Sequence, residues 1–334
     1  MGEMMHLSYA QNMEDYHLEL IFAGEDGGSY VDVGAGHPVA DNVSFHFYLK
    51  GWRGLVVEPQ EALARLYAHV RPRDYAVSCL AGSAEGESDF YVVDKLHGFS
   101  STVRANAEGA SEFGAGYHTV RKSVRPLSGL IEAAGLARID FLKIDVEGGE
   151  AEVLAGIDFT RHRPRVLLIE AVAPGNLAAA WGDWEPALLA QGYHFAFFDR
   201  LNRFYVAEEA KSLLARFPAE PAPWDGVQHL WDHGRAPLRP DHPDHELAQL
   251  LLHGFLAELP CLEPALLATL LARGLAATGK GDLTGPVLAA LMARAAGPGA
   301  APAEAGLEAL LRGDALRAAL GRIASTYDGG HLMD

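Results

Sequence analysis

The chain has 334 residues, of which 49% are apolar, and its 44 acidic residues outnumber its 27 basic residues. The net charge of −17 argues against nucleic acid or an anionic membrane surface as the main partner, and the apolar content argues against global disorder. Cys79 and Cys261 are the only cysteines, so we expect no disulfide framework. The N-terminus lacks a basic segment followed by an apolar stretch, and no run approaches the roughly 18 apolar residues of a membrane span. We therefore expect a cytoplasmic protein without a signal peptide or a membrane span.

Residues 29–37 hold the motif around which we expect the chain to be organised. Val31 and Val33 are β-branched and predict a buried strand, while Gly34 and Gly36 predict a turn whose backbone can approach a ligand closely. Asp41 and Asn42 are candidate N-caps for the helix that follows. A strand, a Gly-x-Gly turn and a helix form the first unit of a nucleotide-binding α/β sheet. Because the motif is common to several kinds of site, other residues have to identify the ligand.

Apolar runs and turn residues predict the remaining elements in chain order. Residues 8–15 are expected to open a short helix, with Ser8 as its N-cap. The predicted strands cover residues 29–33, 55–58, 75–79, 89–93, 118–124, 139–145, 164–170, 193–199 and 202–206, and the predicted helices cover residues 43–48, 61–70, 127–134, 150–156 and 184–190. We expect the last two strands to form an antiparallel hairpin. Residues 86–124 depart from the repeat and are expected to form an inserted or edge element over the sheet.

Composition divides the chain into three parts. Residues 1–217 are expected to form the α/β domain, and repeated prolines predict an extended connector over residues 218–240. From residue 241 to residue 334, Ala and Leu recur with helical spacing, which predicts a small α-helical domain. We expect homo-oligomers to form through these helices. Five histidines between residues 229 and 253 lack a tight zinc spacing and a Cys partner, so we expect them to bind no metal.

Several of the predicted strands end in a carboxylate. In an open α/β sheet, ligands bind at the carboxyl ends of the parallel strands, so these side chains are expected near one site. They are Asp32, Glu58, Asp145 and Glu170. Glu58 ends the second strand after the glycine turn, where an acidic residue can accept both ribose hydroxyls of a nicotinamide or adenosyl cofactor.

The glycine turn favours the adenosyl cofactor. A dinucleotide site needs Gly-x-Gly-x-x-Gly, and this chain has Val39 in place of the third glycine. Asp32 would repel a pyrophosphate but attract the sulfonium and ammonium groups of S-adenosylmethionine, by roughly 1–4 kcal/mol near a surface. The residues expected to bind this cofactor are Asp32, Gly34, Ala35, Gly36, Glu58, Pro59, Ser78 and Asp145. An NAD(P)-dependent Rossmann enzyme is the alternative.

Seven motifs in order resemble the FkbM family of S-adenosylmethionine-dependent methyltransferases. They are SYAQNMED at 8–15, YVDVGA at 30–35, GWRG at 51–54 with Glu58 and Pro59, RPRD at 71–74, Ser101 with Thr102, FLKIDVEG at 141–148 and LNRFYV at 201–206. The resemblance runs from about residue 7 to residue 224, roughly two thirds of the chain, and leaves the helical tail uncovered. The sequence departs from the family pattern at residues 34–38, where Gly-Ala-Gly-His-Pro replaces the common Gly-Ala-Asn-Asp-Pro.

This resemblance implies a seven-stranded class I methyltransferase (Rossmann-like) sheet with an antiparallel last strand, followed here by the C-terminal helical appendage. It also implies methyl transfer, usually to a hydroxyl of a sugar, a glycan or a natural product. Such an enzyme would be an O-methyltransferase with a small-molecule or glycan acceptor. A non-catalytic scaffold that keeps the methyltransferase fold is a further alternative.

Methyl transfer to a hydroxyl needs a base or a metal ion that makes the oxygen nucleophilic. Asp145 is our candidate for the base, and Asp145 and Glu170 could together hold Mg²⁺. In the alternative arrangement, Asp145 orients the methionine ammonium group and His37 or His118 acts as the base.

The remaining polar residues of these motifs have simpler interpretations as well. Ser101 and Thr102, together with Glu170, are expected to line the acceptor pocket, but the two hydroxyl residues also fit an ordinary polar loop. Glu147 and Glu150 fit either the site or the N-terminus of the following helix, where acidic side chains are stabilising.

Overall fold

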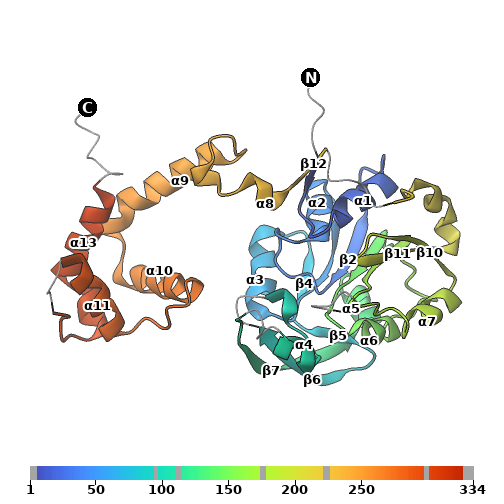
Figure 1. Ribbon diagram of the computed structural model, residues 1–334, viewed down its shortest axis with the longest axis horizontal. Helices are drawn as coiled ribbons and strands as arrows, with labels where there is room; N and C mark the ends of the chain where they lie inside the picture. Colours follow the sequence, from blue (N-terminus) through green and yellow to red (C-terminus); the bar gives the residue numbers. More distant parts are fainter. Residues whose placement is uncertain are drawn as a thin grey trace. The chain divides into compact units, whose positions relative to one another are not determined.

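A computed structural model describes residues 6–93, 97–109, 114–173, 178–220, 226–296 and 301–325. The chain divides into two compact units, Met1–Asp232 and His233–Asp334, whose helices and strands are labelled in Figure 1. Residues 221–225 of the expected connector, which include Pro221 and Pro223, lie outside the described residues.

The first unit holds the strands and most of the helices that the sequence predicts. Its strands are β1 (His6–Ser8), β2 (Ser29–Val33), β3 (Arg53–Val57), β4 (Tyr75–Val77), β5 (Leu80–Gly82), β6 (Gly86–Val93), β7 (Tyr117–Pro126), β8 (Phe141–Ile144), β9 (Val166–Glu170), β10 (Tyr193–Phe198), β11 (Asn202–Ala207) and β12 (Val227–His229). Its helices include α1 (Glu14–Ile21), α2 (Val43–Leu49), α3 (Glu61–Val70), α4 (Arg104–Gly109), α5 (Leu127–Ala133), α6 (Glu150–Ala155) and α7 (Glu185–Ala190).

A seven-stranded sheet forms the centre of this unit, in the order β10-β11-β9-β8-β2-β3-β4. The strands from β9 to β4 pair in parallel, whereas β11 pairs antiparallel with β9 and with β10. On β2, Val31 lies in register with Leu55 of β3 and with Leu142 of β8. The predicted mixed α/β class is confirmed, and so is the predicted hairpin of the last two strands.

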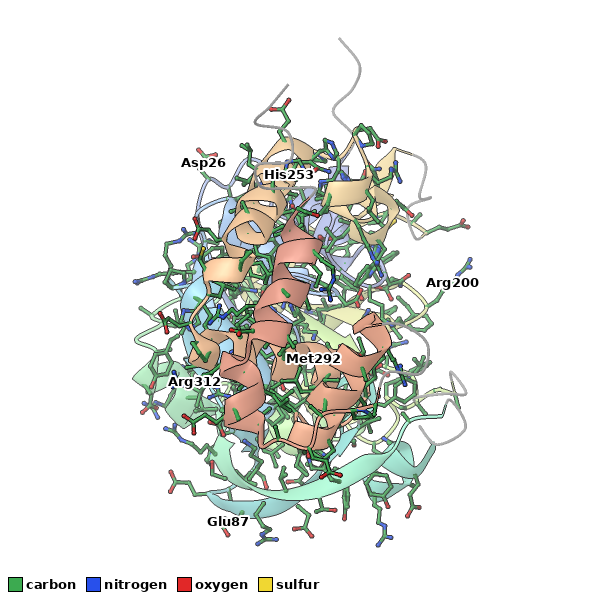
Figure 2. All side chains as sticks on the ribbon, turned by 90° about the vertical axis from the view of Figure 1, so that its left-hand side faces the viewer. Asp26, Glu87, Arg200, His253, Met292 and Arg312 are labelled. Atoms are coloured by element: carbon green, nitrogen blue, oxygen red, sulfur yellow. The ribbon has the colours of Figure 1, made fainter. Side chains whose placement is uncertain are left out.

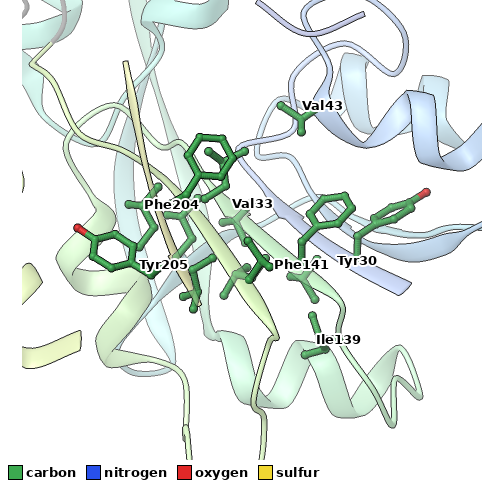
Figure 3. Close-up of a cluster of buried hydrophobic side chains, with 14 of the residues drawn as sticks. Tyr30, Val33, Val43, Ile139, Phe141, Phe204 and Tyr205 are labelled. Atoms are coloured by element: carbon green, nitrogen blue, oxygen red, sulfur yellow. The ribbon is translucent and has the colours of Figure 1, made fainter. Parts of the chain in front are cut away.

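Most side chains of the central strands are apolar on both faces, as a sheet covered by helices on both sides requires, and Asp32 on β2 and Lys143 on β8 are buried charged exceptions. On each of the strands β2, β3 and β8, four consecutive residues are buried. Figure 3 shows the core side chains from β2, β8 and β11 gathered around the sheet, with the rings of Tyr30 and Phe141 stacked at 5.5 Å between centroids. Phe204 and Tyr205, both fully buried, extend this core along β11.

The N-terminal segment differs from the prediction. Ser8 ends strand β1 and is no N-cap, because α1 begins at Glu14. The Ser8 hydroxyl donates to Asp15 Oδ1 at 2.7 Å, and the Tyr9 amide donates to Asp15 Oδ2 at 2.7 Å. These bonds to a buried carboxylate satisfy the backbone of an irregular loop, which local helix signals do not anticipate.

Strand β1 pairs in parallel with β12, so that His6 lies opposite Val227. Part of the segment expected as an extended connector is therefore a strand of the first unit. His229, which ends β12, also bonds through Nε2 to the Ala10 carbonyl at 2.9 Å.

The predicted inserted element is a separate three-stranded sheet in the order β5-β7-β6. Strands β6 and β7 pair antiparallel along their length, from Gly86 opposite Val124 to Val93 opposite Tyr117. Figures 1 and 2 show this sheet at the end of the first unit that lies opposite α1 and β12. Its loops, together with the short helix α4, are therefore available as a wall beside the main sheet.

The second unit is helical. It contains α9 (His245–Glu258), α10 (Pro264–Ala277), α11 (Gly285–Ala296), α12 (Leu307–Arg312) and α13 (Asp314–Ala324). Leucines of four of these helices form its core, among them Leu267, Leu288, Leu310 and Leu320, and Met292 packs against them between the helices in Figure 2. Among the described helices, none combines the length and the hydropathy that a membrane span requires.

A buried arginine cross-links the first unit beside the sheet. The Arg71 side chain is 0% exposed and pairs with Asp74, also 0% exposed, at 2.7 Å. Its guanidinium also donates to Tyr30 Oη, at 2.9 Å, and to Ser44 Oγ, at 2.9 Å. Tyr30 belongs to β2 and Ser44 to α2, so these two hydrogen bonds attach the loop after α3 to both elements.

We predict that Arg71→Met lowers the free energy of unfolding by about 3–5 kcal/mol, because it leaves the Asp74 carboxylate buried without its partner. Urea unfolding measures this loss. The control is Arg104→Met, which removes an exposed ion pair with Glu108 (side chains 66% and 52% exposed) and should leave the free energy of unfolding almost unchanged, because solvent screens such a pair. Equal losses in the two variants would contradict the importance of the buried network.

Candidate functional site

A cavity of about 800 Å³ opens in the first unit, at the carboxyl ends of the central strands. The sheet contributes the loops after β2, β3 and β8, and the inserted element contributes residues 82–84, 86–88, 98–100, 102 and 103 as the facing wall. Six of the eight residues predicted to bind the cofactor line it, namely Gly34, Ala35, Gly36, Glu58, Pro59 and Asp145. Open α/β sheets bind ligands at this edge, so the cavity is the candidate functional site.

The glycine turn and Glu58 form one end of this cavity. Gly34 and Gly36 have φ values of +74° and +61°, in the left-handed region that glycine tolerates. The Gly36 amide donates to Glu58 Oε2 at 2.7 Å, and the Gln60 amide donates to Glu58 Oε1 at 2.7 Å. Burial raises the pKa of Glu58 to about 7 despite these two bonds. Two amides thus hold the carboxylate in place, and each oxygen keeps a lone pair for a ligand hydroxyl.

Gly34 has a second role, because it lies against the backbone of β8. A Cβ atom at this position would lie 1.7 Å from the Asp145 carbonyl oxygen. The same atom at Gly36 would meet nothing within 4 Å. Close contact between the ends of β2 and β8 therefore requires a glycine at residue 34.

Lys143 lies beneath the turn and is fully enclosed by anionic and polar groups. Its Nζ donates to the Gly34 carbonyl at 2.8 Å and lies 3.2 Å from Asp145 Oδ2 and 3.6 Å from Asp32 Oδ1. Burial disfavours the ammonium ion, but the two carboxylates outweigh burial and raise the pKa of Lys143. The residue is charged at neutral pH and lines the cavity.

Asp32 is therefore placed differently from our expectation. Its Oδ2 accepts a hydrogen bond from Ser44 Oγ at 2.6 Å, its Oδ1 faces Lys143, and the side chain does not line the cavity. The ammonium group of Lys143 balances the charge of Asp32. Asp32 therefore affects the cavity indirectly, by holding Lys143 and the end of β2 in position. Its direct contact with a cofactor stays a prediction.

Carboxylates gather at the other end of the cavity. Oxygen atoms of Asp145, Glu147 and Glu170 lie within 4.8 Å of one another. Burial, and then repulsion by Asp145 and Glu150, raise the pKa of Glu147 to about 9. Burial, and then repulsion by Asp145 and Glu147, raise the pKa of Glu170 to about 11. At neutral pH these two groups hold protons, and Glu170 is hydrogen-bonded to Asp145.

Glu147 and Glu150 have distinct roles. Glu150 Oε1 accepts hydrogen bonds from the Gly148 amide at 3.0 Å and from the Val146 amide at 3.3 Å, so this side chain stabilises the start of α6. Glu147 lines the cavity, and its Oε2 is buried without a hydrogen-bond partner among the described residues. Mg²⁺ prefers oxygen ligands of this kind, and its binding by Asp145 and Glu170 stays a prediction.

The three residues predicted for the acceptor pocket have different surroundings in the structure. Thr102 lines the cavity. Ser101 is fully buried, and its hydroxyl donates to the Glu147 carbonyl at 2.7 Å and accepts from the Val103 amide at 2.9 Å, so it holds the wall in place. Glu170 reaches the site through Asp145 rather than by lining the cavity.

Ser78 lies outside the cavity as well. It borders a second, smaller hollow beside α3, and its hydroxyl donates to the Pro59 carbonyl at 3.3 Å. This contact can fix the Pro59 loop, but it gives no support to a direct cofactor contact.

The two histidines considered as bases also differ. His37 lines the cavity, and its Nδ1 accepts hydrogen bonds from the Val39 amide at 3.2 Å and the Ala40 amide at 3.1 Å. The ring proton is then on Nε2, so Nδ1 is already occupied as an acceptor. His118 is exposed on β7 opposite Val92 and does not line the cavity. These contacts favour Asp145 over either histidine as the base.

We predict that Gly34→Ala is at least about 2 kcal/mol more destabilising than Gly36→Ala. Both variants place a side chain in the left-handed region, which costs about 1–2 kcal/mol, but only the first collides with the backbone of β8. Urea unfolding of the two variants compares them directly. Equal losses would mean that the turn does not pack against β8 as described.

We also predict that stability falls as pH rises. Glu170 has a pKa of about 11 in the folded protein and 4.5 as a model group, so between these values the folded state binds more protons than the unfolded chain. The contribution of Glu170 to the free energy of unfolding is complete below pH 4.5. It falls by up to about 1.4 kcal/mol per pH unit as the pH rises towards 11. Unfolding at pH 6, 7.5 and 9 should show a shallower decline for Glu170→Gln than for the wild type. A decline of the same slope would contradict the raised pKa.

Comparison with protein families matches residues 32–195 to the methyltransferase FkbM domain. The matched segment runs from β2 to β10 and includes the glycine turn, Glu58, Lys143 and the carboxylates at the end of β8 and β9. Comparison with curated proteins and with solved structures gives no significant match. The family of this segment is the one that the sequence motifs indicated: residues 32–195 of the chain form an FkbM methyltransferase domain.

Proposed function

We propose that this protein is an S-adenosylmethionine-dependent methyltransferase that methylates a hydroxyl oxygen on a sugar, a glycan or a natural product. We also propose that its seven-stranded sheet is the class I methyltransferase (Rossmann-like) sheet. The observation that carries the proposal is the cavity between Glu58 and Asp145, which lies within the FkbM domain at the carboxyl ends of the strands.

The residues present fit the proposed cofactor. Gly36 leaves open space beside the turn, because a Cβ atom there would meet nothing within 4 Å. Two amides fix the Glu58 carboxylate at the cavity, which supports the proposal that it accepts the ribose hydroxyls. Asp145, Glu147 and Glu170 gather carboxyl groups at one place, and a cationic methionine end there would favour their ionised forms. A nicotinamide dinucleotide would instead bring a pyrophosphate, which these carboxylates would repel.

The chain's own groups can carry out the proton transfer that O-methylation needs. When bound, S-adenosylmethionine supplies a methyl group on a positively charged sulfur. Asp145 lines the cavity, and Lys143 Nζ lies 3.2 Å from its Oδ2, so this carboxylate can take the proton of an acceptor hydroxyl as the oxygen–methyl bond forms. Thr102, on the facing wall, is placed to hold the acceptor.

Cofactor binding provides the first test. Calorimetric titration with S-adenosylhomocysteine should show binding to the wild type, and Glu58→Gln should weaken it about 10-fold or more, because a hydrogen bond to a charged group contributes roughly 1.5–3 kcal/mol. The control is Glu61→Gln, an exposed carboxylate on α3 three residues away, which should bind as the wild type does. Binding of NAD without binding of S-adenosylhomocysteine would overturn the proposal.

The methyl-transfer step can be tested separately with labelled S-adenosylmethionine and a panel of glycans and polyhydroxylated natural products. Asp145→Asn should keep cofactor binding within a few-fold and lose transfer. Cofactor binding by the wild type without transfer to any hydroxyl would instead favour the scaffold alternative.

Oligomer formation through the C-terminal helices also stays a prediction. Helix α9 exposes Leu247, Leu250 and Leu251 by 59%, 71% and 65%. Such a row of exposed leucines is compatible with a subunit contact.

A further inference from the structure

We propose that His6, Asp15 and His46 form a binding site for a divalent transition-metal ion, and that Zn²⁺ is the ion this ligand set suits best. The three residues come from β1, α1 and α2, and each offers one ligand atom within 4.8 Å of the other two. None of them lines the cavity described above, so this site is separate from the proposed methyltransferase site and does not depend on that proposal.

The state of His6 points to a missing partner. Its Nε2 is buried and makes no hydrogen bond with the described residues, which is a costly state for a polar atom.

Asp15 is held rigidly towards the same point. The side chain is fully buried. Its Oδ1 accepts from Ser8 Oγ at 2.7 Å and from the Tyr16 amide at 2.8 Å, whereas its Oδ2 accepts from the Tyr9 amide at 2.7 Å. A carboxylate oxygen has two lone pairs, so Oδ2 can accept one further partner without losing this bond.

His46 has the carboxylate neighbour that commonly orients a metal-binding imidazole. Its Nε2 lies 3.1 Å from Glu19 Oε2, and Glu19 is in turn paired with Lys50 at 2.6 Å. Carboxylates bonded to one ring nitrogen fix the orientation of a ligating histidine and increase its basicity. Glu19 can serve in this way or supply a further oxygen ligand.

Two imidazole nitrogens and a carboxylate oxygen are ligands that Zn²⁺ accepts, with water or Glu19 in the fourth position. Bonds of about 2.0–2.2 Å place tetrahedral donors roughly 3.4 Å apart. The ligand atoms of the three residues now lie within 4.8 Å of one another, so small side-chain rotations would bring them to these distances.

The position of the site indicates a structural role. Strand β1 has three residues and pairs with β12 alone in its sheet. An ion shared by β1, α1 and α2 would attach the N-terminal strand, and through it β12, to the helices beside the main sheet. Since binding to the folded state alone adds to stability by mass action, the ion should raise the melting temperature of the full-length protein.

Zinc titration of the full-length protein, purified without a polyhistidine tag and stripped with a chelator, tests the proposal. Competition with a fluorescent zinc chelator should show one tightly bound equivalent in the wild type. His6→Gln and His46→Gln should each weaken that equivalent by at least 10-fold, whereas His69→Gln, at an exposed histidine of α3, should not change it.

Melting of each chelated variant shows whether it is folded, and zinc should raise the melting temperature of the wild type and of His69→Gln only. If a histidine variant fails to fold, the absorption spectrum of the wild type loaded with Co²⁺ decides, since it reports nitrogen and oxygen ligation. The proposal is overturned if the wild type binds no equivalent. It is equally overturned if both histidine variants bind zinc as the wild type does.

Discussion

The ammonium group of Lys143 is the constraint on which the first unit depends. Lys143 lies on the buried strand β8. Its ammonium group stays charged because Asp32, Asp145 and the Gly34 carbonyl surround it. Taking an ammonium ion and two carboxylates out of water is expensive, and only close pairing offsets that cost. The pairing holds the ends of β2 and β8 together, and those two strand ends form the floor of the cavity. The glycine at residue 34 is required for the same reason, since only a glycine lets the two backbones approach this closely.

One ammonium ion cannot balance the acidic groups around it. Glu147 and Glu170 keep raised pKa values after Lys143 has paired with Asp145, first because they are buried and then because neighbouring carboxylates repel their charged forms. A cationic ligand would lower these pKa values and stabilise the ionised cluster, whereas a pyrophosphate would meet further repulsion. The acidity of the cavity, and not its glycine turn, is thus the feature that separates the two cofactor classes.

The sequence was sufficient for the central strands, because continuous apolar runs ending in carboxylates are typical of parallel strands and leave little choice of position. It was also sufficient for the family that residues 32–195 match and for the position of Glu58 at the cavity. It was insufficient where long-range contacts decide. Ser8 ends a strand because Asp15 and β12 bind this segment, and Ser78 faces away from the cavity because of the direction of its strand end. Lys143 was overlooked, although a lysine inside the run FLKID signals that buried anions must surround it.

A crystal structure of the protein with S-adenosylhomocysteine tests the central claim most directly, because it shows which groups meet each end of the cofactor. We predict that the ribose hydroxyls donate to Glu58, that the adenosine lies against the Gly34–Gly36 turn, and that the methionine end lies beside Asp145 and Glu147. Density for the ligand outside this cavity, or with its ribose away from Glu58, would contradict the account.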